Sequence, residues 1–293
     1  NQMFILGTGF VGKFFAADLK NKGWAVSGSC TSLSSKEKLQ ELGYPAYVFN
    51  AEDPQSEVLE VIKNHTHLLV SIPPLVGFGD PLLHHKELVT TILKDGNLQW
   101  LLYLSSTSMF FCVYGDCGGK LVDEDYPVEP ATDLARARLA AEQQWLSLGT
   151  CLDISAQVFR LGGIYGPGRS AVDTLLKKEK PVKMRPFKTY VSRIHVADIC
   201  QAINASISKA SDGLEKSRIY NVVDDDPASR MQVLEFARRM VGEESSMKEE
   251  QRWWSKKSSG EGEKRVSNGR MKEELGVKLV HPSYRSGLRS IMD

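Results

Sequence analysis

Short apolar runs alternate with amphipathic stretches through the first two-thirds of the chain. Nearly continuous apolar runs predict buried strands at residues 3–6, 24–29, 46–49, 68–72, 100–104 and 155–161, and a further strand at 218–223. Apolar residues gathered on one helical face predict helices at residues 13–21, 134–148 and 229–241. This alternation is typical of βαβ units, so we expect an α/β fold with a doubly wound parallel sheet of six or seven strands.

The pattern changes after residue 242. Residues 243–265 are rich in Glu, Lys and Ser, with Trp253 and Trp254 among them, and predict a polar loop. A last helix is predicted at 268–275, where Gly276 would end it. We therefore expect a core built on the sheet and a smaller C-terminal lobe. The core would hold residues 1–165 and 189–224, and the lobe residues 166–188 and 225–293.

Composition and charge narrow the function classes. The chain is 42% hydrophobic and 25% charged, with a net charge of +1, which is typical of a soluble globular protein and gives no overall field to attract nucleic acid. No run of 18 apolar residues is present, so no membrane span is expected. Five irregularly spaced cysteines do not form a disulfide framework and favour a reducing compartment, the cytoplasm or an organelle stroma.

A glycine-rich turn follows the first predicted strand and opens the first helix. Residues 7–12 have the pattern G-x-G-x-x-G. Gly7 would allow the tight turn, Gly9 the close approach of a pyrophosphate, and Gly12 close packing of helix and strand. Phe10 and Val11 would present backbone N–H groups at the start of the helix. The motif predicts a dinucleotide site, although a flavin would use the same turn.

The end of the second strand bears on the choice of cofactor. NAD-binding proteins carry a carboxylate there, roughly 20 residues after the glycines, whereas this chain has Thr31 and Ser32, followed by Lys36. Hydroxyls and a lysine are able to hold a 2′-phosphate, so we expect NADP rather than NAD. In an alternative that is compatible with this one, Ser34 and Glu37 form a capping box for the next helix.

Two further groups of polar residues bear on the site. Ser71 and Ile72 end the fourth strand, at the sheet edge where doubly wound folds bind ligands, and are predicted to contact the cofactor. The six histidines have no zinc-site spacing, so no metal is expected, and His195 is predicted to be a core residue. Residues 224–226, three aspartates before Pro227, predict a solvated turn.

The chain resembles the extended short-chain dehydrogenase/reductases, the epimerase and dehydratase branch of the Rossmann superfamily. The resemblance rests on the glycine motif and on the segments at residues 105–106, 113–115, 160–168, 193–199 and 274–276. It implies a Rossmann fold, a nicotinamide cofactor, and a small organic substrate between the core and the C-terminal lobe.

The family's catalytic residues are a Ser or Thr, a Tyr, and a Lys four residues after the Tyr. Aligning the chain through residues 139–142 places Leu134 in the tyrosine position and Arg138 in the lysine position. Leu134 cannot donate a proton, while Arg138 would remain charged and bind ribose hydroxyls. Ser106 occupies the expected serine position, unless it only caps local backbone.

A second departure from the family precedes the Val-Tyr-Gly segment. Residues 109–112 form an apparent insertion of about four residues, which would shift the loop over the nicotinamide. Tyr114 is the first candidate for a replacement acid, with Thr132, Asp133 and Tyr165 as others. The candidate catalytic residues are therefore Ser106, Tyr114 and Arg138.

Together these features predict an NADP-binding oxidoreductase or epimerase/dehydratase-like protein that acts on a small molecule as a monomer or homodimer. The alternative is a non-catalytic sensor that binds NADP(H) and passes its redox state to a partner protein. The missing Tyr–Lys pair favours the sensor, whereas Ser106 and the substrate lobe favour an enzyme.

Overall fold

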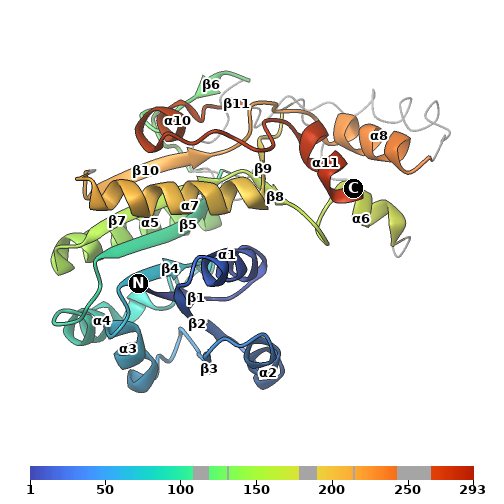
Figure 1. The fold of residues 1–293 in the computed structure, drawn as a ribbon. Coiled ribbons are helices and arrows are strands. Elements are labelled where there is room, and N and C mark those ends of the chain that lie inside the picture. Colours follow the sequence, from blue (N-terminus) through green and yellow to red (C-terminus); the bar gives the residue numbers. More distant parts are fainter. Residues whose placement is uncertain (108–118, 131, 178–189, 214, 243–264) are drawn as a thin grey trace.

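A seven-stranded parallel sheet forms the centre of the molecule (Figure 1). The computed structural model describes residues 1–293 except 108–118, 131, 178–189, 214 and 243–264. The strand order is β10-β7-β5-β4-β1-β2-β3. The strands are β1 (Gln2–Leu6), β2 (Ala25–Cys30), β3 (Ala46–Val48), β4 (His67–Val70), β5 (Trp100–Ser106), β7 (Ser155–Leu161) and β10 (Ser217–Val222).

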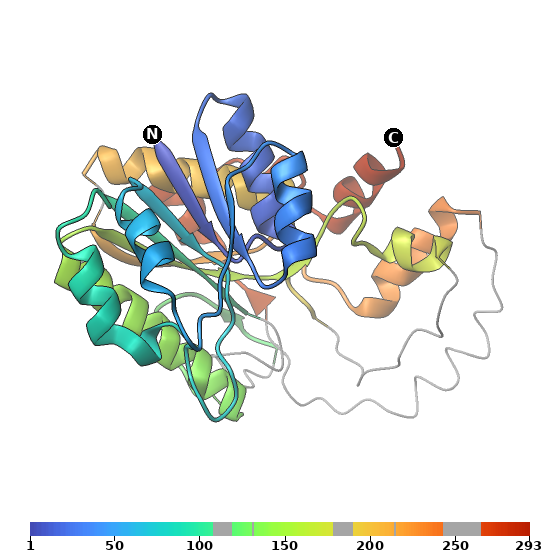
Figure 2. The same ribbon diagram turned by 90° about the horizontal axis from the view of Figure 1, so that it is seen from below.

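Helices cover both faces of this sheet. The described helices of the whole molecule are α1 (Phe10–Asn21), α2 (Leu33–Glu41), α3 (Ser56–Lys63), the 3-10 helix η1 (Leu83–His85), α4 (Lys86–Leu93), α5 (Asp133–Leu152), α6 (Ala171–Leu176), α7 (Val196–Ser211), α8 (Arg230–Met240), α10 (Gly269–Leu275) and α11 (Tyr284–Met292). Figure 2 shows α1 and α7 on one side of the sheet and α4 and α5 on the other. The fold is therefore the doubly wound α/β fold that the sequence predicts.

The alternation of side chains along the strands builds two cores. Met3 and Ile5 of β1 belong to a buried cluster with apolar residues of α1, α7 and α10. Phe4 and Leu6 of the same strand point to the opposite face and join residues of α3, α4 and α5. Strands buried on both faces favour apolar residues at successive positions, which explains the uninterrupted apolar runs of β1 and β5.

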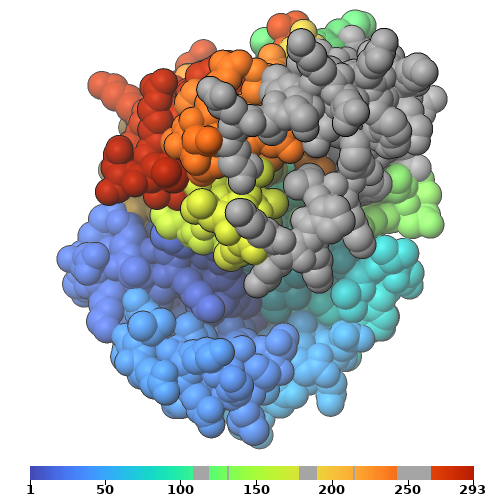
Figure 3. Space-filling model, turned by 90° about the vertical axis from the view of Figure 1, so that its right-hand side faces the viewer, coloured from blue at the N-terminus to red at the C-terminus, as the bar shows by residue number. Residues whose placement is uncertain are grey.

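Two short pairs of strands lie outside the main sheet. β8 (Gly163–Tyr165) pairs with β9 (Arg193–His195), and β6 (Leu121–Val122) pairs with β11 (Arg265–Val266), both in parallel. Helices α6, α8 and α11 share an apolar cluster around Tyr165. In Figure 3 these helices lie together above the blue N-terminal residues. They correspond to the expected C-terminal lobe, while the domain boundaries given above stay a prediction.

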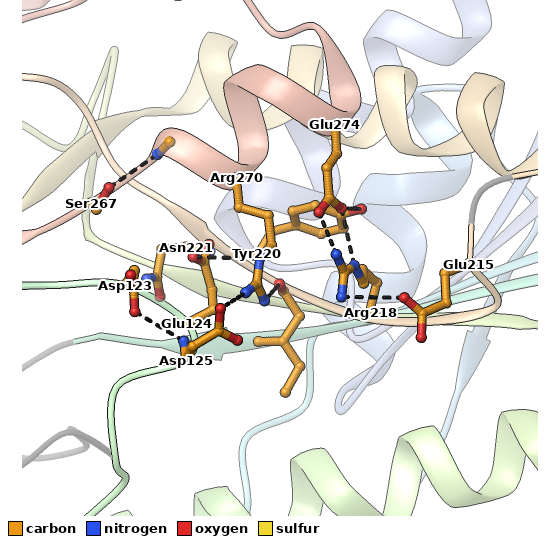
Figure 4. Close-up of polar contacts among 12 residues, drawn as sticks. Asp123, Glu124, Asp125, Glu215, Arg218, Tyr220, Asn221, Ser267, Arg270 and Glu274 are labelled. Carbon is orange, nitrogen blue, oxygen red and sulfur yellow. Dashed lines mark hydrogen bonds and ion pairs between the residues drawn. The ribbon is translucent and has the colours of Figure 1, made fainter.

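The edge strand β10 is covered by side chains rather than by another strand. Asn221 donates its backbone N–H to Oε1 of Glu124 over 2.6 Å, and Arg270 of α10 donates to the carbonyl of Ile219 over 3.4 Å. Arg218 binds Glu274 of α10 (Figure 4). Because an uncovered edge would offer backbone groups to other chains, these contacts protect the sheet from edge pairing.

Most predicted elements agree with the structure to within three residues at each end. The predicted helix at 268–275 corresponds to α10, and Gly276 ends it in the left-handed conformation with φ 70°. The predicted loop at 243–265 lies almost entirely outside the described residues. No described helix is long and apolar enough to cross a bilayer. Cys30, Cys151 and Cys200 are free thiols, while Cys112 and Cys117 lie outside the described residues.

Candidate active site

The glycine-rich turn connects β1 to α1 at the carboxyl edge of the sheet. Gly7 has φ 89°, and a Cβ built there would lie 3.0 Å from Cγ1 of Ile72. A Cβ on Gly12 would lie 3.0 Å from Cγ2 of Ile5. A Cβ on Gly9, in contrast, would meet no described atom within 4 Å. Gly7 and Gly12 are therefore needed for packing, whereas Gly9 borders open space, as a residue facing a ligand would.

Backbone contacts fix this turn to β2. Gly7 donates its N–H to Oγ of Ser29 over 2.9 Å, and Thr8 donates its N–H to the carbonyl of Ser29 over 2.8 Å. Helix α1 then starts at Phe10, with Gly9 as N-cap and no acidic residue in its first turn. The first N–H groups of a helix lack intrahelical acceptors, and the dipole there is positive. The structure thus places the N–H groups of Phe10 and Val11 where an anionic group would be bound.

The end of β2 carries hydroxyls and no carboxylate. Thr31 and Ser32 are exposed after Cys30, and the Lys36 ammonium forms no ion pair with any described residue. Ser32 accepts a hydrogen bond from the N–H of Ser35 over 3.2 Å and caps α2.

The alternative capping box of Ser34 and Glu37 is wrong, because the helix starts two residues earlier and Ser34 lies within it. The Ser32 hydroxyl, which is predicted to contact the cofactor, thus also caps α2.

The carboxyl end of β4 lies beside the glycine turn. Ser71 donates its N–H to the carbonyl of Leu6 over 2.9 Å, and its own carbonyl carbon lies 3.4 Å from the Cβ position of Gly7. Ile72 packs against the same glycine. Ser71 and Ile72 lie far from the glycine motif in sequence. The structure brings them to the turn because β1 and β4 are adjacent strands.

Three hydroxyls follow one another at the end of β5. The hydroxyl of Ser105 is buried and donates to Oε1 of Glu142 over 2.5 Å, and that of Thr107 is buried and donates to the carbonyl of Leu161 over 3.1 Å. Ser106, between them, is half-buried. Because its two neighbours are held in the protein interior, Ser106 is the better placed of the three for a ligand.

Helix α5 carries Leu134 and Arg138, the two residues that the sequence alignment predicts at the family's Tyr and Lys positions. Leu134 is half-buried and Arg138 buried, and their spacing of four residues puts them on one side of the helix. Burial raises the pKa of Tyr103 on β5, and the positive charge of Arg138 opposes that rise. Arg138 thus lies close enough to Tyr103 on the sheet for its charge to act on that phenol. Tyr114 and the 109–112 insertion lie outside the described residues.

A buried ion pair between β7 and α5 lies next to the end of β5. Arg160 of β7 and Glu142 of α5 are joined by hydrogen bonds of 2.8 to 3.2 Å, and their side chains are 3% and 1% exposed. The pair holds Ser105 through Glu142 and so fixes the strand that ends in Ser106. Sequence reasoning missed it. The available signal was an arginine within the predicted buried strand at residues 155–161.

Asp224 corrects the prediction of a solvated aspartate turn. Asp225 and Asp226 form ion pairs with Lys272 and Arg285, but Asp224 is 2% exposed. Burial raises the pKa of Asp224 to about 8, although the N–H of Asp226 and the charge of Arg193 oppose the rise. The three adjacent aspartates therefore have different environments, which their sequence alone does not distinguish.

His195 packs in the interior and caps a helix, as the sequence predicts for a core histidine. His195 is buried, and its Nδ1 accepts the N–H of Ala197 over 3.2 Å at the start of α7. Burial lowers the pKa of His195 to about 4, with a smaller contribution from His281. Among the described residues, no group of three or more His, Cys, Asp or Glu side chains is arranged to hold a metal ion.

Comparisons with known proteins agree with this geometry. Residues 80–222 match the model of the NAD dependent epimerase/dehydratase family. A solved structure from Silicibacter pomeroyi DSS, of a functionally unknown conserved protein, is 30% identical, with a TM-score of 0.77 over 99% of this chain and 98% of that one. Protein YeeZ of Escherichia coli (strain K12) is 28% identical over 289 residues, 96% of each chain.

A more distant structure shares the fold and was solved with a dinucleotide. The UDP-glucuronic acid 4-epimerase of Bacillus cereus, in complex with UDP-glucuronic acid and NAD, is 16% identical, with a TM-score of 0.72 over 99% of this chain and 97% of that one. The sequence resemblance to the epimerase and dehydratase branch of the extended short-chain dehydrogenase/reductases is thus confirmed. The chain belongs to the NAD-dependent epimerase/dehydratase family.

Proposed function

We propose that this protein binds a nicotinamide dinucleotide at the glycine-rich turn and acts on a small organic substrate at the carboxyl edge of the sheet, as an oxidoreductase or an epimerase/dehydratase-like enzyme. The observation that carries the proposal is the open space at Gly9, beside the first N–H groups of α1. Ser71 and Ile72 follow β4, and Ser106 is the last residue of β5, at the same edge of the sheet. The dinucleotide would supply hydride transfer, and Ser106 would hold the substrate oxygen.

The residues on α5 set a limit on the chemistry. In the absence of a phenol at position 134, no side chain there protonates a developing alkoxide, and the buried Arg138 supplies positive charge without passing a proton. General acid catalysis contributes typically about 10²- to 10⁴-fold to a rate. We therefore expect slow reduction of generic ketones and aldehydes by the wild-type protein.

An NADPH-oxidation assay with a panel of small carbonyl compounds measures this. Leu134→Tyr combined with Arg138→Lys is expected to raise the slow rate, and Leu134→Phe with Arg138→Lys, which lacks only the hydroxyl, is the matched control. Fast turnover by the wild-type protein that persists in a Ser106→Ala, Tyr114→Phe double variant would show that the catalytic residues are assigned wrongly.

Leu134 and Arg138 also favour a second candidate, a sensor that binds NADP(H) without turning over a substrate. A sensor needs no proton donor next to the nicotinamide, which accounts for the leucine. The two functions differ in a binding measurement. A sensor changes its affinity for a partner protein between NADP and NADPH, whereas an enzyme oxidises NADPH when its substrate is present.

We further propose that the cofactor is NADP. The hydroxyls of Thr31 and Ser32 support this choice, as does the Lys36 ammonium, which forms no ion pair with a described residue. They offer hydrogen bonds and positive charge to a 2′-phosphate. Thr31→Asp is expected to change the ratio of NADP to NAD affinity by roughly 10- to 100-fold in favour of NAD, through repulsion of the phosphate. Titration calorimetry with both dinucleotides measures the ratio, and Thr31→Asn, which lacks the charge, should leave it nearly unchanged. Wild-type protein that binds NAD as tightly as NADP would refute the proposal.

A further inference from the structure

An arginine from the C-terminal part of the chain lies against the glycine-rich turn. The chain between β8 and α6 descends towards α1 (Figure 1), and the guanidinium carbon of Arg169 lies 5.3 Å from the centre of the Phe10 ring. Phe10 is the first residue of α1 and directly follows Gly9. Both Arg169 and Gly9 are exposed to solvent.

The backbone around Arg169 is held in place. Gly166 and Arg169 exchange two backbone hydrogen bonds of 3.0 and 3.1 Å, and Gly168 has φ 78°, as a type II turn with Pro167 before it requires. A Cβ on Gly166 would lie 2.6 Å from Cγ1 of Val196 and 3.4 Å from Cζ of Phe10. The turn at 166–169 is therefore packed closely between α1 and α7, which fixes where the arginine starts.

The Arg169 guanidinium forms no ion pair among the described residues. No described carboxylate forms an ion pair with its guanidinium, in contrast to Arg136, Arg160, Arg218, Arg239, Arg270 and Arg285. The first turn of α1 also lacks an acidic residue that would attract it. An arginine stacked on a ring keeps its N–H groups available for an anion at the ring's edge.

The N-terminus of α1 balances only part of the charge of a pyrophosphate. The positive end of a helix is equivalent to roughly half an elementary charge, which is less than the negative charge of a pyrophosphate. A guanidinium supplies a full charge and donates two parallel hydrogen bonds to phosphate oxygens. We propose that Arg169 binds the pyrophosphate of the dinucleotide together with the N-terminus of α1. This inference rests on the proposed function, and it adds a cofactor contact from outside the N-terminal half of the chain.

Titration of variants with ligand fragments tests the proposal. Arg169→Ala is expected to lower the affinities for NAD and for ADP-ribose by the same factor, on the order of tenfold, because both ligands contain the pyrophosphate. Adenosine lacks the pyrophosphate, so it should compete for the site equally well in the variant and in the wild type. The loss should shrink at high ionic strength, where charges are screened, and Arg169→Lys should retain part of the affinity.

Arg289 provides a matched control. It is also exposed and stacked on a ring, 5.5 Å from the centre of Phe236 in the C-terminal lobe, so Arg289→Ala should leave all affinities unchanged. Wild-type affinity of Arg169→Ala for NAD and ADP-ribose would overturn the inference, as would a loss for NAD alone or an equal loss for adenosine. If Gly9→Val still abolishes binding in that case, the proposed function stands and only the role of Arg169 fails. If the wild-type protein binds no dinucleotide, both fail.

Discussion

Glu142→Leu is expected to lower the free energy of unfolding by about 3–5 kcal/mol, because it leaves the Arg160 guanidinium buried without its carboxylate. The Ser105 hydroxyl loses its acceptor at the same time. A domain of ordinary stability has only about 5–15 kcal/mol in total, so the loss should be plain in a urea unfolding curve.

Two further variants separate charge burial from general damage. Adding Arg160→Met to Glu142→Leu should recover much of the loss, since an apolar pair leaves no charge in the core. Lys22→Ala breaks the exposed pair with Asp18 and should cost less than about 1 kcal/mol. A Glu142→Leu protein no less stable than Lys22→Ala would show that the buried pair does not hold α5 to the sheet.

The main sheet was predictable because its strands are covered on both faces. A strand such as β5 is apolar without interruption from Trp100 to Leu104, and this pattern is visible in sequence. The glycine turn was predictable for a related reason, since a positive φ at Gly7 and close packing at Gly12 both exclude larger residues. Local constraints of this kind leave a direct record in the residue type.

Features that depend on distant contacts were not predictable in the same way. Asp224 is buried by β9 and its neighbours, yet in sequence it looks like the first residue of a polar turn. Glu142 and Arg160 lie 18 residues apart and meet only because α5 packs on β7. Arg169 comes to Phe10 through the turn at 166–169, and no local pattern indicates that approach.

Gly9→Val is expected to abolish dinucleotide binding while the protein remains folded. The Cβ position of Gly9 meets no described atom within 4 Å, so the protein accommodates a side chain there. The added methyl groups would occupy the space that we assign to the pyrophosphate. The loss of glycine from the N-cap should cost about 1 kcal/mol or less. Gly9→Ala, with a smaller side chain, should weaken binding less than valine does.

Calorimetric titration of the wild-type and Gly9→Val proteins with NADP and NAD tests the central claim most directly, with thermal unfolding of both proteins recorded alongside. The account predicts saturable binding of at least one dinucleotide by the wild type, no detectable binding by the variant, and a similar unfolding transition for both. A folded Gly9→Val protein with wild-type affinity, or a wild type that binds neither dinucleotide, would contradict it.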